Sequence, residues 1–141
     1  MKSKLKVVVP AVLVLAGGAY KFVLAKPTAA KAKIDGTVYV LPREFVVNLA
    51  DNRLAKVDVA LVLKSAPAAG TEASTPPDGY GDLPEEAAVR DIVTNTITGE
   101  SAHDLTSRTG RERTKRLILR AILANTDVEA TGVLLTDVAV Q

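Results

Sequence analysis

The side chains best suited to chemistry in this 141-residue chain are a single histidine, His103, and a few carboxylates. A histidine can bind a metal or move protons, but no second histidine and no cysteine is present to share a metal site with it. Glu85, Glu86 and Asp104 fall where helices are expected to begin, and the helix dipole favours negative charge there. We therefore expect structural roles for all four residues and no metal site.

The hydroxyl residues and glycines follow no catalytic pattern either. Ser101 and Ser107 have no identifiable base partner, and the glycines at 17–18, 79–81 and 110 match no phosphate-binding spacing. Without cysteine, disulfides and thiolate chemistry are excluded. We predict a protein that is not an enzyme and that has no catalytic residues and no cofactor.

The strongest charged motif is RTGRERTKRLILR, residues 108–120, in which six basic residues accompany one acid, Glu112. A basic amphipathic helix of this kind can lie on anionic lipid or on an acidic partner, including a second copy of the chain. The simpler interpretation is a solvated outer face whose Leu/Ile stripe packs on a sheet. The candidate interaction surface comprises Arg108, Arg111, Lys115, Arg116 and Arg120.

The net charge of +2 conceals an asymmetry along the chain. Residues 1–34 hold seven lysines and no acid, whereas residues 35–141 hold eleven basic and sixteen acidic residues. Because the part expected to fold is acidic, we predict no nucleic-acid partner. The acidic 35–104 region is instead complementary in charge to the basic helix.

The apolar segment VVVPAVLVLAGGAYKFVLA, residues 7–25, contains one charged residue. A helix of this length rises about 28 Å, close to a hydrocarbon core of about 30 Å. The segment equally fits a cleavable signal peptide, because lysines precede an apolar run and small residues follow it. These residues alone leave both interpretations open. If the segment is an anchor, its characteristic residues are Val7, Leu13, Leu15, Gly17, Gly18, Tyr20 and Lys21.

If the anchor is retained, residues 1–6 form a short N-terminus, 7–25 a transmembrane helix and 26–36 a linker. Residues 37–141 then predict one α+β domain. Two β-branched stretches, 37–41 and 44–49, precede a turn and the alternating strand 56–64, and together they predict a β-hairpin. The strand is expected to place one apolar face on the core: Val57, Val59, Leu61 and Leu63. Residues 65–82 predict a flexible loop, because they are rich in Pro, Gly, Ala and Ser.

Two helices and a last strand are expected after this loop. Asp82 as N-cap, Glu85 as its reciprocal partner and Gly99 at the end delimit the first helix. Its buried stripe should contain Val89, Ile92, Val93, Thr96 and Ile97. After a short turn at 104–106, the second helix should bury Leu117, Ile118, Ala121 and Ile122, with Leu119 and Leu123 widening the stripe. Residues 133–140 predict the last strand, so the expected order is β-β-α-α-β.

Five segments in this order resemble one known family. They are LPREFVVNLAD (41–51), LAKVDVALVLK (54–64), AAVRDIVTNTITGESAHDL (87–105), GRERTKRLILRAILAN (110–125) and the closing TDVAVQ (136–141). Each is weak alone, but together they resemble the FliL family of flagellar basal-body-associated proteins over about residues 37–141, with the loop 65–82 unmatched. One departure is Ala139, which stands where the family commonly has a bulkier residue.

The resemblance implies a single-pass inner-membrane protein with a cytoplasmic N-terminus and a periplasmic domain similar to the stomatin/prohibitin (SPFH, band 7) fold. It also implies a homo-oligomeric ring around the stator units of the flagellar motor, supporting torque, swimming and swarming. The family carries no catalytic residues. It favours retention of the 7–25 anchor, because a ring component must stay beside the stator. The alternative is a secreted or envelope-associated binding module with a cleaved signal peptide.

Overall fold

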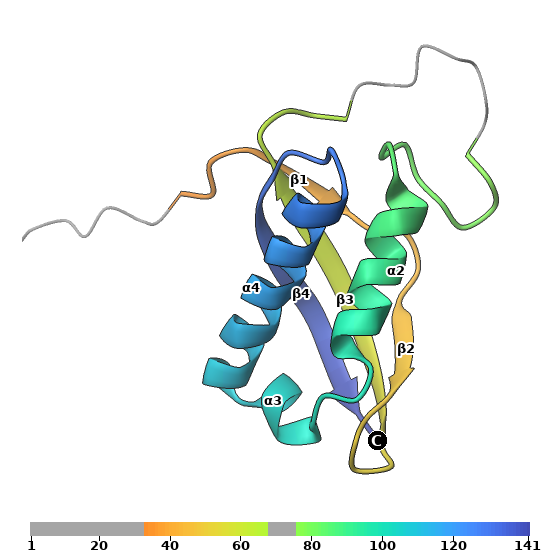
Figure 1. The fold of residues 1–141 in the computed structure, drawn as a ribbon, viewed down its shortest axis with the longest axis vertical. Coiled ribbons are helices and arrows are strands. Elements are labelled where there is room, and N and C mark those ends of the chain that lie inside the picture. Colours follow the sequence, from red (N-terminus) through yellow and green to blue (C-terminus); the bar gives the residue numbers. More distant parts are fainter. Residues whose placement is uncertain (1–32, 68–75) are drawn as a thin grey trace, which may run out of the picture. The chain divides into compact units, whose positions relative to one another are not determined.

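The computed structural model describes residues 33–67 and 76–141, which form one α+β unit (Figure 1). The proposed anchor, residues 7–25, lies outside the described residues. Within the two described ranges, no helix combines the length and the apolar character that a bilayer-spanning segment needs.

The sheet is built around one long strand, β3 (Leu54–Leu63). β4 (Ala130–Val140) runs antiparallel to β3 and pairs with it from Ala55 to Leu63. β1 (Thr37–Val40) and β2 (Phe45–Asn48) pair with the two ends of β3, also antiparallel. Since the same β3 residues pair with β4 as well, β1 and β2 must lie end to end along the opposite edge of β3.

A short interruption separates β1 from β2. Pro42 has no backbone N–H to donate, and Arg43 has a left-handed backbone with φ of 62°. The guanidinium of Arg90 donates to the Pro42 carbonyl and stacks 4.4 Å from the centroid of the Phe45 ring. The predicted hairpin of β2 and β3 is confirmed. The predicted order β-β-α-α-β is wrong at two places. This interruption makes 37–41 and 44–49 two separate strands, and a short helix, Ala102–Thr106, replaces the predicted turn at 104–106.

The alternation predicted for β3 is confirmed. Its odd-numbered residues from 55 to 63 are all buried in the core that the helices cover. Burial alternates only as far as Asp58, because Ala60 and Val62 are buried as well.

The odd-numbered residues of β2 face the same side, since Phe45 pairs with Val57. In β4, a register shift beside Asp58 and Val59 changes the parity, so Val133 pairs with Leu61 and Val138 pairs with Val57. Each large aliphatic side chain buried in this way contributes about 1.5–3 kcal/mol relative to an exposed one.

Three helices cover one face of the sheet: α2 (Glu86–Ile97), α3 (Ala102–Thr106) and α4 (Arg108–Asn125) (Figure 1). The buried stripe of α2 consists of Val89, Val93 and Ile97, as predicted, with Ile92 and Thr96 half-buried beside it. In α4, Ile118 and Ile122 are fully buried. Leu117, Leu119 and Ala121 are half-buried. The prediction for Leu123 is wrong: its side chain lies on the solvent side of α4 and is 54% exposed.

The N-cap predicted at Asp82 is wrong. α2 begins at Glu86, and the residue before it, Glu85, adopts a left-handed backbone without a side-chain cap. The start is displaced because Leu83 turns into the core and the Glu86 carboxylate reaches back to the N–H of Gly81 at 2.9 Å. The predicted end at Gly99 is confirmed, with φ of +80° after the last turn.

Helices α3 and α4 are capped by serine. Ser101 Oγ accepts from the N–H of Asp104, and Ser107 Oγ accepts from the N–H of Gly110. The described parts of the predicted loop, 65–67 and 76–82, contain neither helix nor strand. The two caps explain why the two serines lie where they do without any catalytic role.

Deletion of Leu135–Gln141 is expected to abolish folding. It removes the half of β4 that pairs with residues 54–59 of β3 and exposes Val57 and Val59 at the centre of the core. Circular dichroism and thermal melting of the full-length and truncated chains measure the effect. Ala139→Ser, at an exposed position of β4, is the control and should melt like the parent chain. A truncated chain that melts cooperatively with native-like circular dichroism contradicts the expectation.

Gly110→Ala is expected to destabilise the domain although alanine favours helices by about 1 kcal/mol. A Cβ at this buried position would lie 2.2 Å from the backbone carbonyl oxygen of Asp104, which cannot move without shifting α3. The clash outweighs the propensity, and we expect a net loss of about 1–3 kcal/mol in the free energy of unfolding.

Thr109→Ala is the matched control, because Thr109 is exposed in the same turn of α4. Its effect should stay within about 0.5 kcal/mol. Urea unfolding of the two variants beside the parent measures both. Equal or higher stability of Gly110→Ala would show that α3 and α4 are not in this close contact.

Candidate interaction surface

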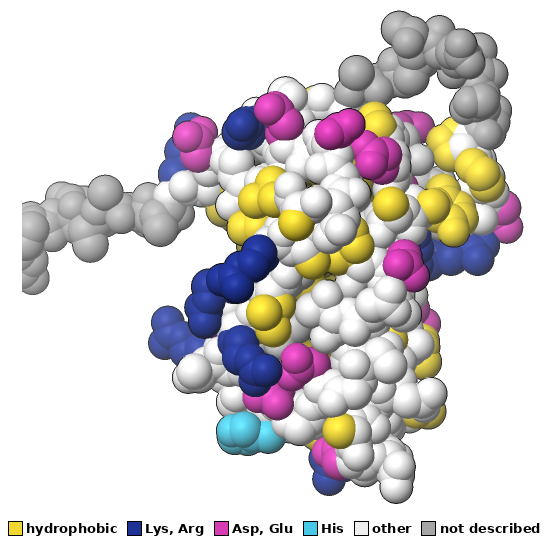
Figure 2. Space-filling view, viewed as in Figure 1, with side chains coloured by type: hydrophobic (Ala, Val, Ile, Leu, Met, Phe, Trp, Pro, Cys, Tyr) yellow, Lys and Arg dark blue, Asp and Glu magenta, His cyan; other side chains and the backbone are white. Residues whose placement is uncertain are grey.

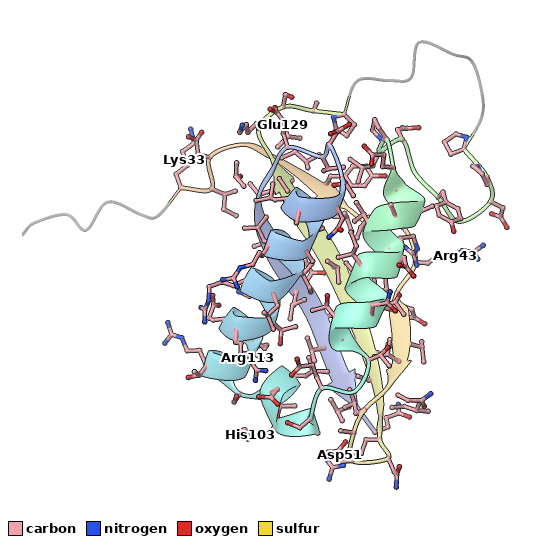
Figure 3. All side chains as sticks on the ribbon, viewed as in Figure 1. Lys33, Arg43, Asp51, His103, Arg113 and Glu129 are labelled. Carbon is pink, nitrogen blue, oxygen red and sulfur yellow. The ribbon has the colours of Figure 1, made fainter. Side chains whose placement is uncertain are left out.

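The residues that are most capable of chemistry are dispersed. His103 projects from α3 at the periphery of the domain (Figure 3) and is exposed. Asp104 binds Ser101 in a reciprocal helix cap, and the hydrogen bond from Ser101 Oγ, at 2.6 Å, together with nearby Arg113, lowers the pKa of the Asp104 carboxyl. Across residues 33–67 and 76–141, no three His, Asp or Glu side chains converge in a way that could hold a metal ion.

One buried carboxylate, Glu86, has a role that the sequence pattern did not reveal. It is only 3% exposed, and its Oε2 accepts from the Tyr39 hydroxyl at 2.6 Å and from the N–H of Gly81 at 2.9 Å. The Tyr39 hydroxyl in turn accepts from the N–H of Leu83 at 3.3 Å. The cluster joins β1 to the segment that enters α2. Tyr39 and Glu86 are 47 positions apart, so no local spacing connects them.

The Tyr39 hydroxyl acts here as a donor and not as an acid catalyst. Burial, together with its hydrogen bond to the Glu86 carboxylate, raises the pKa of Tyr39 to about 12. The phenol therefore keeps its proton throughout the physiological range. We infer a structural role for Tyr39 and Glu86, because their hydrogen bond connects β1 to the start of α2.

The basic residues predicted as an interaction surface all belong to α4, and Figure 2 shows Lys and Arg side chains gathered along this side of the domain. They form two groups. Arg108, Arg111 and Lys115 line a hollow of about 530 Å³ between α4 and residues 135–138 of β4. Arg116 and Arg120 are exposed on the solvent side of the helix.

Ion pairs distinguish the members of this surface. Lys115 Nζ binds Glu112 at 2.6 Å, a hydrogen bond that also lowers the pKa of Glu112. Arg113 is not among the predicted members of the surface. Its guanidinium contacts Glu100 at 3.9 Å and Asp104 at 3.6 Å. Within the described residues, four predicted members have no ion-pair partner: Arg108, Arg111, Arg116 and Arg120. Four unpaired guanidiniums on one helix suit an anionic or acidic binding partner.

One known protein family matches almost the whole of the described domain. The model of "Flagellar basal body-associated protein FliL" matches residues 38–141, from β1 to the last residue of the chain. The chain belongs to the FliL family. This match confirms the resemblance seen in the sequence segments.

Family membership makes the chain a flagellar basal-body accessory protein with a role in motility. Apart from Thr37, the first residue of β1, the FliL match contains every helix and strand described here, including α4 with its unpaired arginines. It begins after the segment predicted as the anchor. No curated protein matches the chain significantly.

Tyr39→Phe is expected to lower the free energy of unfolding by about 1–2 kcal/mol at pH 7, because Glu86 loses a hydroxyl donor in a buried site. The parent has a pH dependence that the variant lacks. A tyrosine whose folded pKa is raised to about 12 contributes stability that is fully present below pH 10 and is lost as the pH rises through about 12. The difference in the free energy of unfolding between parent and variant should therefore become smaller between pH 10 and 12.

Urea unfolding at pH 7 and at pH 11 measures this difference. Tyr80→Phe is the control, because Tyr80 is 41% exposed and should change stability by no more than about 0.5 kcal/mol at either pH. If Tyr39→Phe lowers the free energy of unfolding equally at pH 7 and at pH 11, the result would contradict the hydrogen bond between Tyr39 and Glu86.

Proposed function

We propose that this FliL-family chain is a non-enzymatic scaffold of the flagellar motor. Residues 7–25 anchor it in the inner membrane, and the domain of residues 37–141 lies in the periplasm. There it forms a homo-oligomeric ring around the stator units and supports torque, swimming and swarming. The family match over residues 38–141 carries this proposal.

The features of the domain agree with a role in binding. α4 presents unpaired arginines, while the buried polar cluster of Tyr39 and Glu86 is committed to structure. A scaffold acts through differential contact: it biases the stator toward its load-bearing state by binding that state more tightly than the resting one. No cofactor takes part. The arrangement of an antiparallel sheet with helices on one face is compatible with the SPFH-like fold that the family resemblance implies.

The anchor is needed for such a role, because a free periplasmic domain would diffuse away from the stator. A retained helix also places Lys21 near the outer boundary of the bilayer, where its side chain can reach the headgroups. Gly17 and Gly18 would let the helix approach a stator helix closely. Each of these roles follows from the residue types alone.

The second candidate function is a released envelope binding module. The observation in its favour is the basic face of α4, which also suits anionic lipid or polysaccharide. In this alternative the N-terminal segment is cleaved, and the mature chain begins near Tyr20 or Lys26.

Replacement of residues 1–30 by a cleavable signal peptide separates the two functions. The scaffold proposal expects swimming in viscous medium to fall to the level of a strain lacking the chain, because the domain no longer stays at the motor. The control strain carries the unmodified chain at the same expression level, and immunoblotting verifies that the released domain accumulates in the periplasm.

Undiminished swimming under viscous load would overturn the scaffold proposal. Intact mass spectrometry of the native protein provides an independent measurement: a chain that retains residues 1–25 supports the anchor, and a chain shortened at its N-terminus supports the released module.

A further inference from the structure

The face of the sheet turned away from the helices has no covering element in the described part of the chain. All three helices pack on the opposite face (Figure 1). The strand register places Val38 beside Val62, Val40 beside Ala60, and Ala60 beside Leu134 on this side. Ala60 and Val62 are themselves buried, so the accessible apolar part of this side consists of Val38, Val40 and the half-buried Leu134. Val38 and Val40 are 44% and 58% exposed, which is unusual for valines in a sheet. We call this the outer sheet face, defined by Val38, Val40, Leu134, Asp58 and Asp137.

Two carboxylates of like charge lie side by side on this face. Asp58 of β3 pairs directly with Asp137 of β4 in the register. Directly opposite residues have Cβ atoms about 4.5–5.5 Å apart, and like charges there repel. The nearest lysine along β3, Lys56, is bound to Glu44 at 2.5 Å. Neither aspartate has an ion-pair partner among residues 33–67 and 76–141.

The complementary surface lies on the same chain. Arg116, Arg120 and Leu123 follow one another at intervals of four and three residues, so they form a stripe along the solvent side of α4. Both arginines lack an acidic partner in the described residues, and Leu123 is 54% exposed. The stripe therefore offers two cations beside an apolar side chain. The outer sheet face offers two anions beside an apolar patch.

We propose that the α4 stripe of one copy docks on the outer sheet face of a second copy. Arg116 and Arg120 then neutralise Asp58 and Asp137, while Leu123 packs against Val40 and Leu134. This inference rests on the proposed function, because it names the surfaces through which the scaffold self-associates. It goes beyond that function by assigning a role in self-association to Asp58 and Asp137.

The position of the two surfaces determines the kind of assembly. α4 packs on one face of the sheet and turns its stripe to solvent, whereas Asp58 alternates with the inward Val57 and Val59 and so belongs to the other face. Asp137 lies on the edge strand β4, where it also borders the hollow lined by Arg108 and Arg111 of α4. A contact between unlike surfaces is heterologous, so an open series of copies has one unused surface at each of its two ends until the series closes. Closed rings follow when the rotation between copies allows it.

Disulfide cross-linking tests the contact directly, because the native chain has no cysteine. The probe is the full-length chain in its own membranes, carrying Asp58→Cys together with Arg116→Cys. The sheet separates the two positions within one copy, so a disulfide between them has to join two copies. Mild oxidation should produce a ladder of dimers, trimers and larger species on non-reducing gels.

Asp58→Cys with His103→Cys is the matched control, because His103 is exposed on α3, at the periphery of the domain and outside the stripe. We expect the ladder to be at least about tenfold weaker in the control, as a contact disfavoured by about 1.4 kcal/mol would be. Charge reversal with Arg116→Glu and Arg120→Glu should weaken assembly about tenfold, and Asp58→Lys with Asp137→Lys in the same chain should restore it. All four positions are at least partly exposed, so folding is not at risk.

The outcomes separate this inference from the proposed function. A ladder with Arg116→Cys and rescue by the reversed aspartates support the docking. A chain that sediments as an oligomer in detergent but yields no ladder overturns the docking and leaves the scaffold intact. A chain that remains monomeric both in detergent and with an amine-reactive cross-linker overturns both. A cross-link from position 58 to another protein, or to a cysteine placed at position 31 of the same chain, overturns the docking by showing a different occupant.

Discussion

The whole domain depends on one central strand, β3, which is paired with neighbouring strands along both of its edges. β3 receives β4 along one edge and the pair β1 and β2 along the other, so its backbone groups are satisfied from both sides. Its odd-numbered side chains then form the floor on which α2 and α4 pack. A one-residue slip would turn these side chains to the solvent, so the apolar pattern of β3 specifies the register of its neighbours.

The same arrangement leaves the domain two-sided. Helices bury the inner face. The outer face keeps exposed valines and two aspartates that pair with each other in the register and form no ion pair in the described residues. An antiparallel sheet tolerates one solvated face, but a solvated face is normally polar. The departure from that pattern, together with the unpaired arginines of α4, connects the fold to self-association. In our proposal, the exposed apolar residues of this face serve assembly between copies of the domain.

Polar groups inside the domain support structure at its two most irregular points. Arg90 bridges the interruption between β1 and β2 by binding the Pro42 carbonyl and stacking on Phe45. Tyr39 and Glu86 close the entry into α2. Both devices join segments more than 40 residues apart. They hold the chain at the β1–β2 interruption and at the start of α2, where backbone hydrogen bonds of strands and helices are missing.

The sequence by itself determined the α+β class, the alternating face of β3, the stripe Val89, Val93 and Ile97, the basic character of α4 and the family. All of these are periodic or composed of neighbouring residues, and periods of 2 and 3.6 are visible in one dimension. Only the tertiary structure decided the separation of β1 from β2, the start of α2 at Glu86 and the exposure of Leu123. Each of these results from partners distant in sequence, which override local capping and helix preferences.

The outer sheet face could not be seen in the sequence for the same reason. Val40, Asp58 and Leu134 come from three strands, and only the register of β3 with its neighbours brings them together. Asp58 and Asp137 are unremarkable in the chain and become neighbours through a single β-bridge. Local pattern therefore specified which residues enter the core. Pairing between distant strands decided which residues the domain leaves available to a partner.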